Sequence, residues 1–551
     1  MNRCFPPAVR LLACLLVAGA WLRAAEATPA PPEKANLLRQ ILIADTVEAA
    51  QALSHVPDGG FLIVSPKLGK IDQVELLRRL KSGENKPITE RLLAAVAQVV
   101  EVFMRSSGYA IATAIIPPQN IGEGALRVAV LPGKVRNIKI EGNRWFSESL
   151  LREKLRIERG GLVQVAELDQ SLAWTNGNQF RRVKLHVEPV ADTGEADLFF
   201  AVQERFPLRF TAGYENTGNE ILGLDRYSGT VTYGNLWGLD HQVSYQQAMS
   251  HSTKLLRVHA FDYRAPLPWR HILTVSASSA KVNPTFFSGL FTQLGKSVNA
   301  DVKYVIPTRL KQWEGEVTAG LSFKQTNNNL EFGGQFADFS MNDLFSASLS
   351  ASAVRPDQRG RWVVSATLIG SPGDLNSRNT DETLGKSRFG ARSRYLYGQA
   401  WAQRVTFLAP GLSSIARLST QLAGTNLVPS EQFSAGGLNT VRGYEERVLS
   451  GDSGFVFSHE VQRALPAIPL GKKLPRMDLV GAFFWDYGRT IIKHPLIGET
   501  KAAYLSSVGL GLRCSVGSYF SATADYGRQL EQIETPGAPH HRLHVKMSLA
   551  Y

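Results

Sequence analysis

Short alternating segments fill the chain from about residue 206 to its last residue. Within 317–323, and again within 543–549, apolar residues occupy every second position, and polar residues or glycine lie between them. Successive side chains of a β-strand point to opposite faces of its sheet, so each segment predicts a strand with one apolar and one polar face. Gly, Asn, Asp and Pro separate the segments, as they do at the turns of an antiparallel sheet.

Apolar faces of this extent are found in soluble sandwiches and in membrane barrels. A sandwich buries its apolar faces in one core, whereas a sheet in lipid must close because lipid offers its edges no hydrogen-bond partner. As in membrane barrels, the last residue, Tyr551, is aromatic, and other aromatic residues stand near strand ends: Tyr227, Tyr233, Trp485, Tyr487 and Tyr504. We therefore predict a transmembrane β-barrel over 206–551, and at roughly 9 to 11 residues per spanning strand plus loops this length fits about 16 strands.

Helical and strand periods alternate between residues 37 and 205. In 88–108, apolar residues recur at three- and four-residue steps, which predicts a helix with one buried face. Strands are predicted at 110–116 and 125–131, and a second cycle follows. That cycle contains a strand, two helices and two more strands, at 135–141, 147–156, 165–176, 183–187 and 197–203. We expect two small α+β domains, at 37–132 and 133–205.

Residues 1–27 have the layout of a secretory signal peptide. Arg3 and Arg10 precede an apolar run at 11–22, and small residues end at Ala27, after which we expect cleavage. The run is shorter than the roughly 20 residues that a membrane-spanning helix needs. Residues 28–36 are rich in proline and alanine and are expected to form a linker. Since Cys514 is the one cysteine beyond the signal, we expect no intramolecular disulfide.

The sequence carries a formal net charge of +13, from 61 basic and 48 acidic residues. A basic balance also occurs in proteins that bind nucleic acid. Here the basic residues are scattered rather than clustered, so they fit a water-filled lumen and loops that face lipopolysaccharide. We therefore expect contact with outer-membrane lipid and lipopolysaccharide, and no nucleic-acid partner.

Two short motifs raise the question of catalysis or metal binding. The segment 451–454, Gly-Asp-Ser-Gly, is similar to the nucleophile segment of chymotrypsin-like proteases, but such a serine needs a histidine base and no matching histidine segment is present. His540, His541 and His544 fall on a predicted loop and strand rather than on one face of a helix. Neither a phosphate-binding Gly-Lys loop nor a zinc-type spacing occurs. We expect no enzymatic activity, no cofactor and no metal.

Two further motifs place charged residues where the barrel pattern predicts the lumen. The first is Val441-Arg442-Gly443-Tyr444, in a long connection at about 423–453 between predicted strands. The second comprises Phe484, Asp486 and Gly488, which alternate with the outward residues of a strand and so point inward. If the connection folds inward, Arg442 and Asp486 can form a charge-assisted hydrogen bond in a partly dehydrated lumen.

These motifs resemble those of the outer-membrane transporters of two-partner secretion, the ShlB/FhaC/HecB haemolysin secretion and activation family, within the superfamily that contains the barrel assembly factor. Val-Arg-Gly-Tyr is similar to the tip of the family's sixth extracellular loop, which folds into the barrel, and the second motif matches the family's Phe-x-Asp-x-Gly wall motif. The resemblance extends to 117–124, near the end of the first polypeptide-transport-associated (POTRA) domain, and to 326–330. Five predicted strands follow residue 454, which places the loop between strands eleven and twelve of sixteen.

The resemblance implies an α+β region followed by an all-β region: two tandem POTRA domains in the periplasm, then a 16-stranded antiparallel transmembrane β-barrel in the cell outer membrane. It implies a translocator that binds an unfolded exoprotein with an N-terminal secretion domain and secretes it through the barrel, with haemolysin activation as a further possibility. It also implies a monomer that the barrel assembly machinery inserts, with Tyr551 as the C-terminal barrel signal.

Two other functions are compatible with this organisation. An assembly or insertion factor would open the first and last strands to template client barrels, but such factors tend to have more than two POTRA domains. A passive channel would leave the POTRA domains without a role. Members of the resembled family often carry a plug helix before the first POTRA domain. Because 28–37 is short and contains three prolines, we expect no plug helix here and the Arg442 loop as the main obstruction of the lumen.

Overall fold

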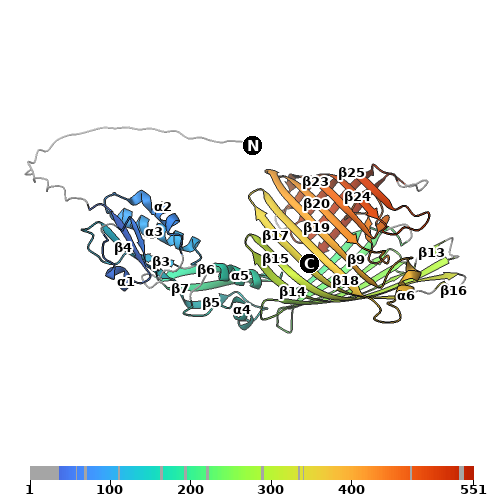
Figure 1. The fold of residues 1–551 in the computed structure, drawn as a ribbon, viewed down its shortest axis with the longest axis horizontal. Coiled ribbons are helices and arrows are strands. Elements are labelled where there is room, and N and C mark those ends of the chain that lie inside the picture. Colours follow the sequence, from blue (N-terminus) through green and yellow to red (C-terminus); the bar gives the residue numbers. More distant parts are fainter. Residues whose placement is uncertain are drawn as a thin grey trace, which may run out of the picture. The chain divides into compact units, whose positions relative to one another are not determined.

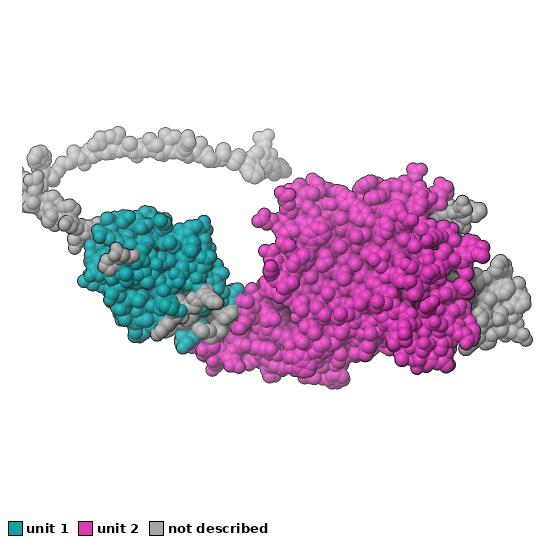
Figure 2. All heavy atoms as spheres, viewed as in Figure 1, with its two compact units in different colours: residues 1–134, 162–165, 189–195 teal, residues 135–161, 166–188, 196–551 magenta. Residues whose placement is uncertain are grey.

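A computed structural model describes residues 36–551, apart from 57–58, 67–70, 110–111, 162–164, 191–194, 219–221, 284, 287–290, 333–334, 339–340, 472–474 and 533–538. The predicted signal peptide and nearly all of the predicted linker, including the place of a plug helix, lie outside the described residues. The chain separates into two compact units (Figure 2): 1–134 with 162–165 and 189–195, and 135–161 with 166–188 and 196–551. No helix in the described ranges is long and apolar enough to cross a membrane.

The first unit is a four-stranded sheet with helices on both faces (Figure 1). Its strand order is β2 (Leu62–Val64), β1 (Gln40–Ala44), β4 (Ala125–Pro132) and β3 (Ala112–Ile115). One face packs on α2 (Gln73–Leu80) and α3 (Glu90–Ser106), where Leu76 and Phe103 are buried. On the other face, Ala44 and Ala129 pack against Ala50 of α1 (Val47–Ala52). The helix predicted at 88–108 is therefore present, whereas β1, α1, β2 and α2 had no individual prediction.

A second α+β segment precedes the barrel and belongs to the same compact unit as the barrel. Its elements are β5 (Lys134–Glu141), α4 (Glu148–Leu155), α5 (Val165–Thr175), β6 (Arg181–Val190) and β7 (Glu195–Glu204), with the sheet order β5-β7-β6. All five elements were predicted, in this order and of these types. Phe146, Leu151, Phe180 and Phe200 are buried in its core, so the apolar periods of the sequence mark the sides that pack together.

Buried charges attach the second segment to the turn between β9 and β10. Arg181 donates hydrogen bonds of 2.5 and 2.9 Å to the two carboxylate oxygens of Asp240, whose side chain also lies 2.9 Å from the Lys154 ammonium. Asn178 donates a further hydrogen bond of 2.7 Å to the same carboxylate. Burial lowers the pKa of Lys154, although the negative charge of Asp240 opposes this shift. All of these groups are largely buried, so each charge needs its partner in place. These contacts therefore fix how the second segment meets the turn between β9 and β10, a connection called the joint below.

Sixteen long antiparallel strands close into a barrel, as predicted. Each strand pairs with its neighbours in the chain, and the first pairs with the last. The short strands β13 (Thr285–Phe286) and β16 (Gln335–Asp338) pair with the long strands β14 and β15. The spanning strands are β8 (Leu208–Glu215), β9 (Arg226–Leu236), β10 (His241–Ser250), β11 (Leu256–Pro266), β12 (Ile272–Val282), β14 (Phe291–Leu310), β15 (Trp313–Phe332), β17 (Met341–Asp357), β18 (Gly360–Pro372), β19 (Arg394–Ala409), β20 (Leu412–Ala423), β23 (Ser453–Ile468), β24 (Met477–Ile491), β25 (Ala502–Val516), β26 (Phe520–Gln529) and β27 (His541–Ala550).

The two faces of the barrel wall differ as the alternation predicts. Large apolar side chains on the outer face are mostly exposed: Leu321 is 67% exposed, Leu510 65% and Leu549 59%. On the inner face, carboxylates such as Asp486 and Asp525 are almost fully buried. An apolar exterior and a polar interior are the arrangement of a membrane barrel.

The seam between the last and the first strand is short. β27 and β8 are in register over five residue pairs, from Thr211 opposite Ala550 to Glu215 opposite Lys546. Backbone hydrogen bonds of 3.0 and 2.9 Å between Phe210 and Tyr551 extend the pairing at one end. At the other end the Asn216 side chain accepts a hydrogen bond of 2.7 Å from the N–H of Val545, so a side chain continues the ladder where the strand ends.

Candidate functional site

The connection between β20 and β23, residues 424–452, turns back into the barrel and carries the Val-Arg-Gly-Tyr motif. It joins strands eleven and twelve, as the sequence predicts. Its two arms form a short hairpin of β21 (Phe433–Ala435) and β22 (Leu449–Gly451). Below this hairpin, Val441 and Tyr444 are buried in a cluster that includes Val456 and Leu505 of the wall. The loop tip is therefore packed against the wall and is not free in the lumen.

Arg442 at the loop tip is bound to Asp486 on β24. The Arg442 backbone N–H donates a hydrogen bond of 3.1 Å to this carboxylate, and the guanidinium donates two more, of 2.8 and 2.9 Å. Arg442 is 5% exposed and Asp486 is 0% exposed. A bidentate arginine–carboxylate pair of this kind is among the stronger hydrogen-bonded pairs in proteins, and it fixes orientation as well as distance.

Further charged groups surround this pair. Arg442 also donates a hydrogen bond of 2.6 Å to Glu460 on β23, and its guanidinium lies 3.7 Å from Asp525 on β26. Arg513 on β25 bridges the same two carboxylates, at 2.5 Å from Asp525 and 3.2 Å from Glu460. Two arginines thus face three carboxylates, so neither arginine is left without a counter-charge. Removing either guanidinium would leave buried negative charge behind.

Phe484 supports the guanidinium from the wall. Its ring lies beneath Arg442, with the guanidinium carbon 3.5 Å from the ring centroid, and the side chain is completely buried. A cation over an aromatic face is attracted to it, and more strongly where water is excluded. Phe484 and Asp486 lie two residues apart on β24, so one strand supplies both the ring and the carboxylate that hold Arg442.

Two glycines make the close approach of loop and wall possible. Gly443 has a φ of +92°, and a Cβ at this position would lie 3.0 Å from the backbone of Gly527 on β26. A Cβ at Gly488 on β24 would lie 2.7 Å from the Val441 side chain and 3.2 Å from that of Ala435. A larger residue at either position would therefore displace the tip.

The residues around Arg442 attach the tip to the last strands of the barrel. The Gly443 N–H donates a hydrogen bond of 3.0 Å to Nε2 of His544 on β27. The Gly443 carbonyl accepts one of 2.8 Å from the Gln529 side chain. The Tyr444 hydroxyl donates one of 2.8 Å to the Ser506 carbonyl on β25. The tip thus contacts the wall from β23 to β27.

A second anchor lies at the base of the loop. Asp452 is fully buried, and its carboxylate accepts hydrogen bonds of 2.8 Å from the N–H groups of Leu427 and Lys493. The same carboxylate forms an ion pair with Arg388, which follows α6 (Asp381–Ser387) in a neighbouring loop. Asp452 lies in the segment that is similar to a protease motif. Its contacts show a structural role at the junction of three loops.

The structure thus brings all seven residues of the two predicted motifs together at one place, and the eighth predicted residue, Tyr551, lies apart from them. Tyr551 follows β27 at the other end of the wall and is 92% exposed. Sequence reasoning missed Glu460, Arg513, Asp525 and His544. Strand alternation marks these positions as inward, which was the available signal, but it does not say which inward side chains meet. Within the described ranges, no group of three or more His, Cys, Asp or Glu side chains is placed to hold a metal ion.

The sequence is similar to known proteins over most of its length. Residues 194–514 match the family described as haemolysin secretion/activation protein ShlB/FhaC/HecB, and 66–133 match the ShlB-type POTRA domain. The heme/hemopexin transporter protein HuxB of Haemophilus influenzae is 22% identical over 456 residues, 81% of this chain and 79% of HuxB. The outer membrane transporter CdiB-2 of Burkholderia pseudomallei is 23% identical over 453 residues, 75% of this chain and 70% of CdiB-2.

Solved structures share the fold. CdiB from Escherichia coli superposes with a TM-score of 0.72 at 16% identity, covering 96% of this chain and 93% of that one. CdiB from Acinetobacter baumannii superposes with a TM-score of 0.62 at 18% identity, covering 95% and 91%. The family match spans more than half of the sequence, so this chain belongs to the ShlB/FhaC/HecB family of haemolysin secretion/activation proteins.

Proposed function

We propose that this outer-membrane transporter of two-partner secretion receives an unfolded exoprotein in the periplasm and passes it through a lumen that the Arg442 loop obstructs at rest. The observation that carries the proposal is the bonding of the loop tip, where Arg442 contacts Asp486, Glu460 and Ser458. A tip held by so many charged contacts is a defined closed state, and transport requires those contacts to break. Members of this family are transporters rather than enzymes.

Capture of the exoprotein is assigned to the two α+β segments, both acting as POTRA domains. In the second of them β6 lies at an edge of the sheet, next to β7. An extended chain can add to such an edge through backbone hydrogen bonds, which do not require one particular sequence. This mode suits an unfolded cargo, because its side chains vary from one position to the next.

Passage through the lumen follows the polar inner face. A cavity of about 430 Å³ lies beside Arg442, and its lining includes Arg417, Glu460, Arg513 and Lys546. Such a wall keeps an extended chain hydrated. Because the docked loop tip obstructs the lumen, it has to move before the exoprotein can pass. We assign the driving force to folding of the exoprotein outside the cell.

The surroundings of the barrel complete the proposal. The outer apolar face contacts lipid, and the loops contact lipopolysaccharide. The sheet closes within one chain, so a monomer suffices for a complete barrel, and the barrel assembly machinery is assigned its insertion. Tyr551, exposed at the end of the last strand, is assigned to that insertion step.

Deletion of the gene tests the function. We expect one exoprotein to disappear from the culture medium and the population of outer-membrane barrels to stay constant, as measured by quantitative mass spectrometry of both fractions. Restoring the wild-type gene should restore export. Loss of many outer-membrane barrels on deletion would instead identify an assembly factor, and unchanged exoproteins and barrels would identify a passive channel.

A further inference from the structure

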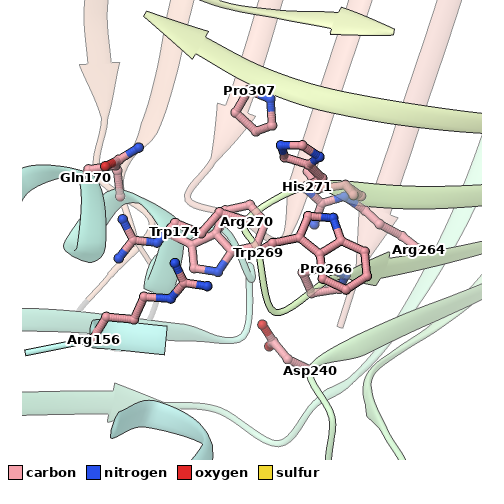
Figure 3. Close-up of a pocket in the computed structure, with 13 residues that line it drawn as sticks. Arg156, Gln170, Trp174, Asp240, Arg264, Pro266, Trp269, Arg270, His271 and Pro307 are labelled. Atoms are coloured by element: carbon pink, nitrogen blue, oxygen red, sulfur yellow. The ribbon is translucent and has the colours of Figure 1, made fainter. Parts of the chain in front are cut away.

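A cavity of about 530 Å³ lies where α5 of the second α+β segment meets the periplasmic rim of the barrel (Figure 3). Trp174 of α5 lines one wall. The turn between β11 and β12 contributes Trp269 and Arg270. Arg264 near the end of β11 and Pro307 near the end of β14 complete the lining from the barrel side. Figure 3 shows these side chains gathered around one space from both helix and strands.

The cavity carries an excess of positive charge. Arg156, Arg264 and Arg270 line it, and among the described residues Asp240 is the one acidic lining residue. The Asp240 carboxylate is already occupied by Arg181 and Lys154, which lie behind the wall. The nearest negative charge therefore neutralises two other cations, and the three arginines of the lining keep their attraction for an anion.

Donor groups in the cavity lack acceptors. In the part of the chain that the structure describes, Arg264 has no hydrogen-bond or ion-pair partner, and Nε of Arg270 is buried without an acceptor. Arg270 is held in place at its other end, where it donates a hydrogen bond of 2.7 Å to the Ser171 hydroxyl. Nε of Arg270 is closed off from the cavity, so Arg264 is the guanidinium that a ligand's acceptor can reach, and a charge-assisted hydrogen bond to it adds affinity.

Aromatic rings lie beside these charges. Trp269 is 54% exposed and is held by the hydrogen bond of 2.7 Å that its indole N–H donates to the Tyr304 hydroxyl. Trp174, Pro266 and Pro307 add apolar surface to the lining. Indole rings bind other aromatic side chains by stacking and by edge contacts. The cavity thus combines guanidinium groups for a carboxylate with rings for an aromatic residue.

The position of Arg264 on β11 indicates which face of the barrel wall borders the cavity. On β11 the outward residue Phe261 is 43% exposed, whereas Asp262 accepts a hydrogen bond of 2.7 Å from Ser276 of the neighbouring strand. Arg264 lies two residues beyond Asp262, on the same inward face. Ile272 and its register partner Val305 are buried on the inward faces of β12 and β14. Arg264, Ile272 and Pro307 therefore line the cavity from the lumen side, where a polypeptide passes. Trp269 is bonded to Tyr304, on the outward face of β14, and so lies at the rim between the two faces.

We infer that this cavity is a binding subsite for the unfolded exoprotein, and that it takes a segment in which an aspartate or glutamate adjoins an aromatic residue. The carboxylate pairs with Arg264 beside the positive charge of Arg270, and the aromatic side chain packs against Trp269. The inference rests on the proposed function, since it names a step between capture and passage through the lumen.

Peptide binding to the full-length transporter in lipid nanodiscs tests the subsite. The probe is a fluorescein-labelled peptide that alternates aspartate with tryptophan, and its matched control replaces each aspartate by asparagine. We expect the wild-type protein to bind the acidic peptide about 10-fold more tightly, because a charge-assisted pair adds roughly one decade of affinity in a partly dehydrated site. Arg264→Gln should remove most of this preference, and Arg264→Glu should favour a matched lysine peptide. Arg309→Gln, at an exposed arginine on the same rim, should leave the preference unchanged.

Several results would overturn the inference. Equal affinities of the wild-type protein for the acidic and asparagine peptides would do so, and so would an unchanged preference in Arg264→Glu. If Arg264→Gln instead weakened retention of phosphatidylglycerol, measured by native mass spectrometry, and left peptide binding intact, the cavity would be a lipid site. Export in cells separates this inference from the proposed function. Export that depends on the gene but is unaffected by Arg264→Glu refutes only the subsite, whereas export that persists after gene deletion refutes the function itself.

Discussion

Replacement of Arg442 by alanine should release the loop tip from the barrel wall. The mutation removes the guanidinium that donates two hydrogen bonds to Asp486, one to Glu460 and one to Ser458. The wall keeps its carboxylates, and Asp486 is 0% exposed. In the variant, the closed state therefore contains buried negative charge that has lost its main partner.

The magnitude follows from what Asp486 retains. Removing one partner of a buried ion pair costs about 3–5 kcal/mol. Asp486 still accepts a hydrogen bond of 2.6 Å from the Ser458 hydroxyl and one of 3.1 Å from the backbone N–H of residue 442. We therefore expect a value near the lower limit, about 3 kcal/mol, which corresponds to roughly a 150-fold larger population of the open tip.

Amide hydrogen exchange measures this opening directly. The Gly443 N–H is bonded to His544 only when the tip is docked, so exchange of peptides that cover 436–448 reports the closed state. Exchange should accelerate about 150-fold in Arg442→Ala, limited by the stability that the loop has in the wild-type protein. Arg447→Gln is the matched control, because Arg447 lies exposed in the same loop and forms no ion pair with any described residue, so the change should alter exchange little.

One result would refute this reasoning. If Arg442→Ala forms a normal barrel, judged by heat-modifiable migration on gels, and the exchange of 436–448 stays within about 3-fold of wild type, the charged contacts do not hold the tip. The exchange result stands apart from export, because it measures docking of the loop whatever the cargo does.

Three further predictions concern other parts of the molecule. Gly488→Ala should overpack Val441 and destabilise the docked tip by about 1–3 kcal/mol, visible as faster exchange of the tip, whereas Gly481→Ala on the same strand, where the nearest atom lies at 3.7 Å, should have little effect. Asp240→Asn should leave Arg181 and Lys154 buried without a counter-charge and weaken the joint by about 3–5 kcal/mol, so protease should cleave near residue 205 faster. Asp169→Asn, at an exposed position on α5, is the control. Equal cleavage of the two variants would contradict the role of Asp240. Asp452→Asn should free the α6 loop, and limited proteolysis at 373–393 should accelerate while the barrel stays intact; unchanged proteolysis would show that the Arg388 contact is dispensable.

The strands and their inward faces follow directly from the sequence, because a two-residue period is a local property of the chain. Leu543 and Leu549 mark one face of β27 without any knowledge of its neighbours. The contact between Arg442 and Asp486 was also foreseeable, since each residue lies in a recognisable motif and the loop between β20 and β23 was long enough to turn inward. Both conclusions need only one strand or one loop at a time.

The rest of the site depends on register between strands that are far apart in the chain. Glu460 and Asp525 meet the same arginine because β23 to β26 align as they do, and single-strand patterns do not fix that alignment. The burial and pairing of Asp240 were even harder to predict from the sequence. An aspartate in a turn is ordinarily a solvent-exposed residue, and its partner Arg181 lies 59 positions earlier in the chain. Its burial arises only when the second α+β segment meets the barrel.

The described bonds of Arg442, Gly443 and Tyr444 to the wall all reach strands that follow them in the sequence. The eleven strands before the loop can pair with one another without the tip, but the tip has its full set of partners only when β27 has brought His544 into place. The complete set of contacts of the docked loop therefore requires a complete barrel. A chain that stops short of its final strand lacks His544, and with it part of the binding site for its own obstruction.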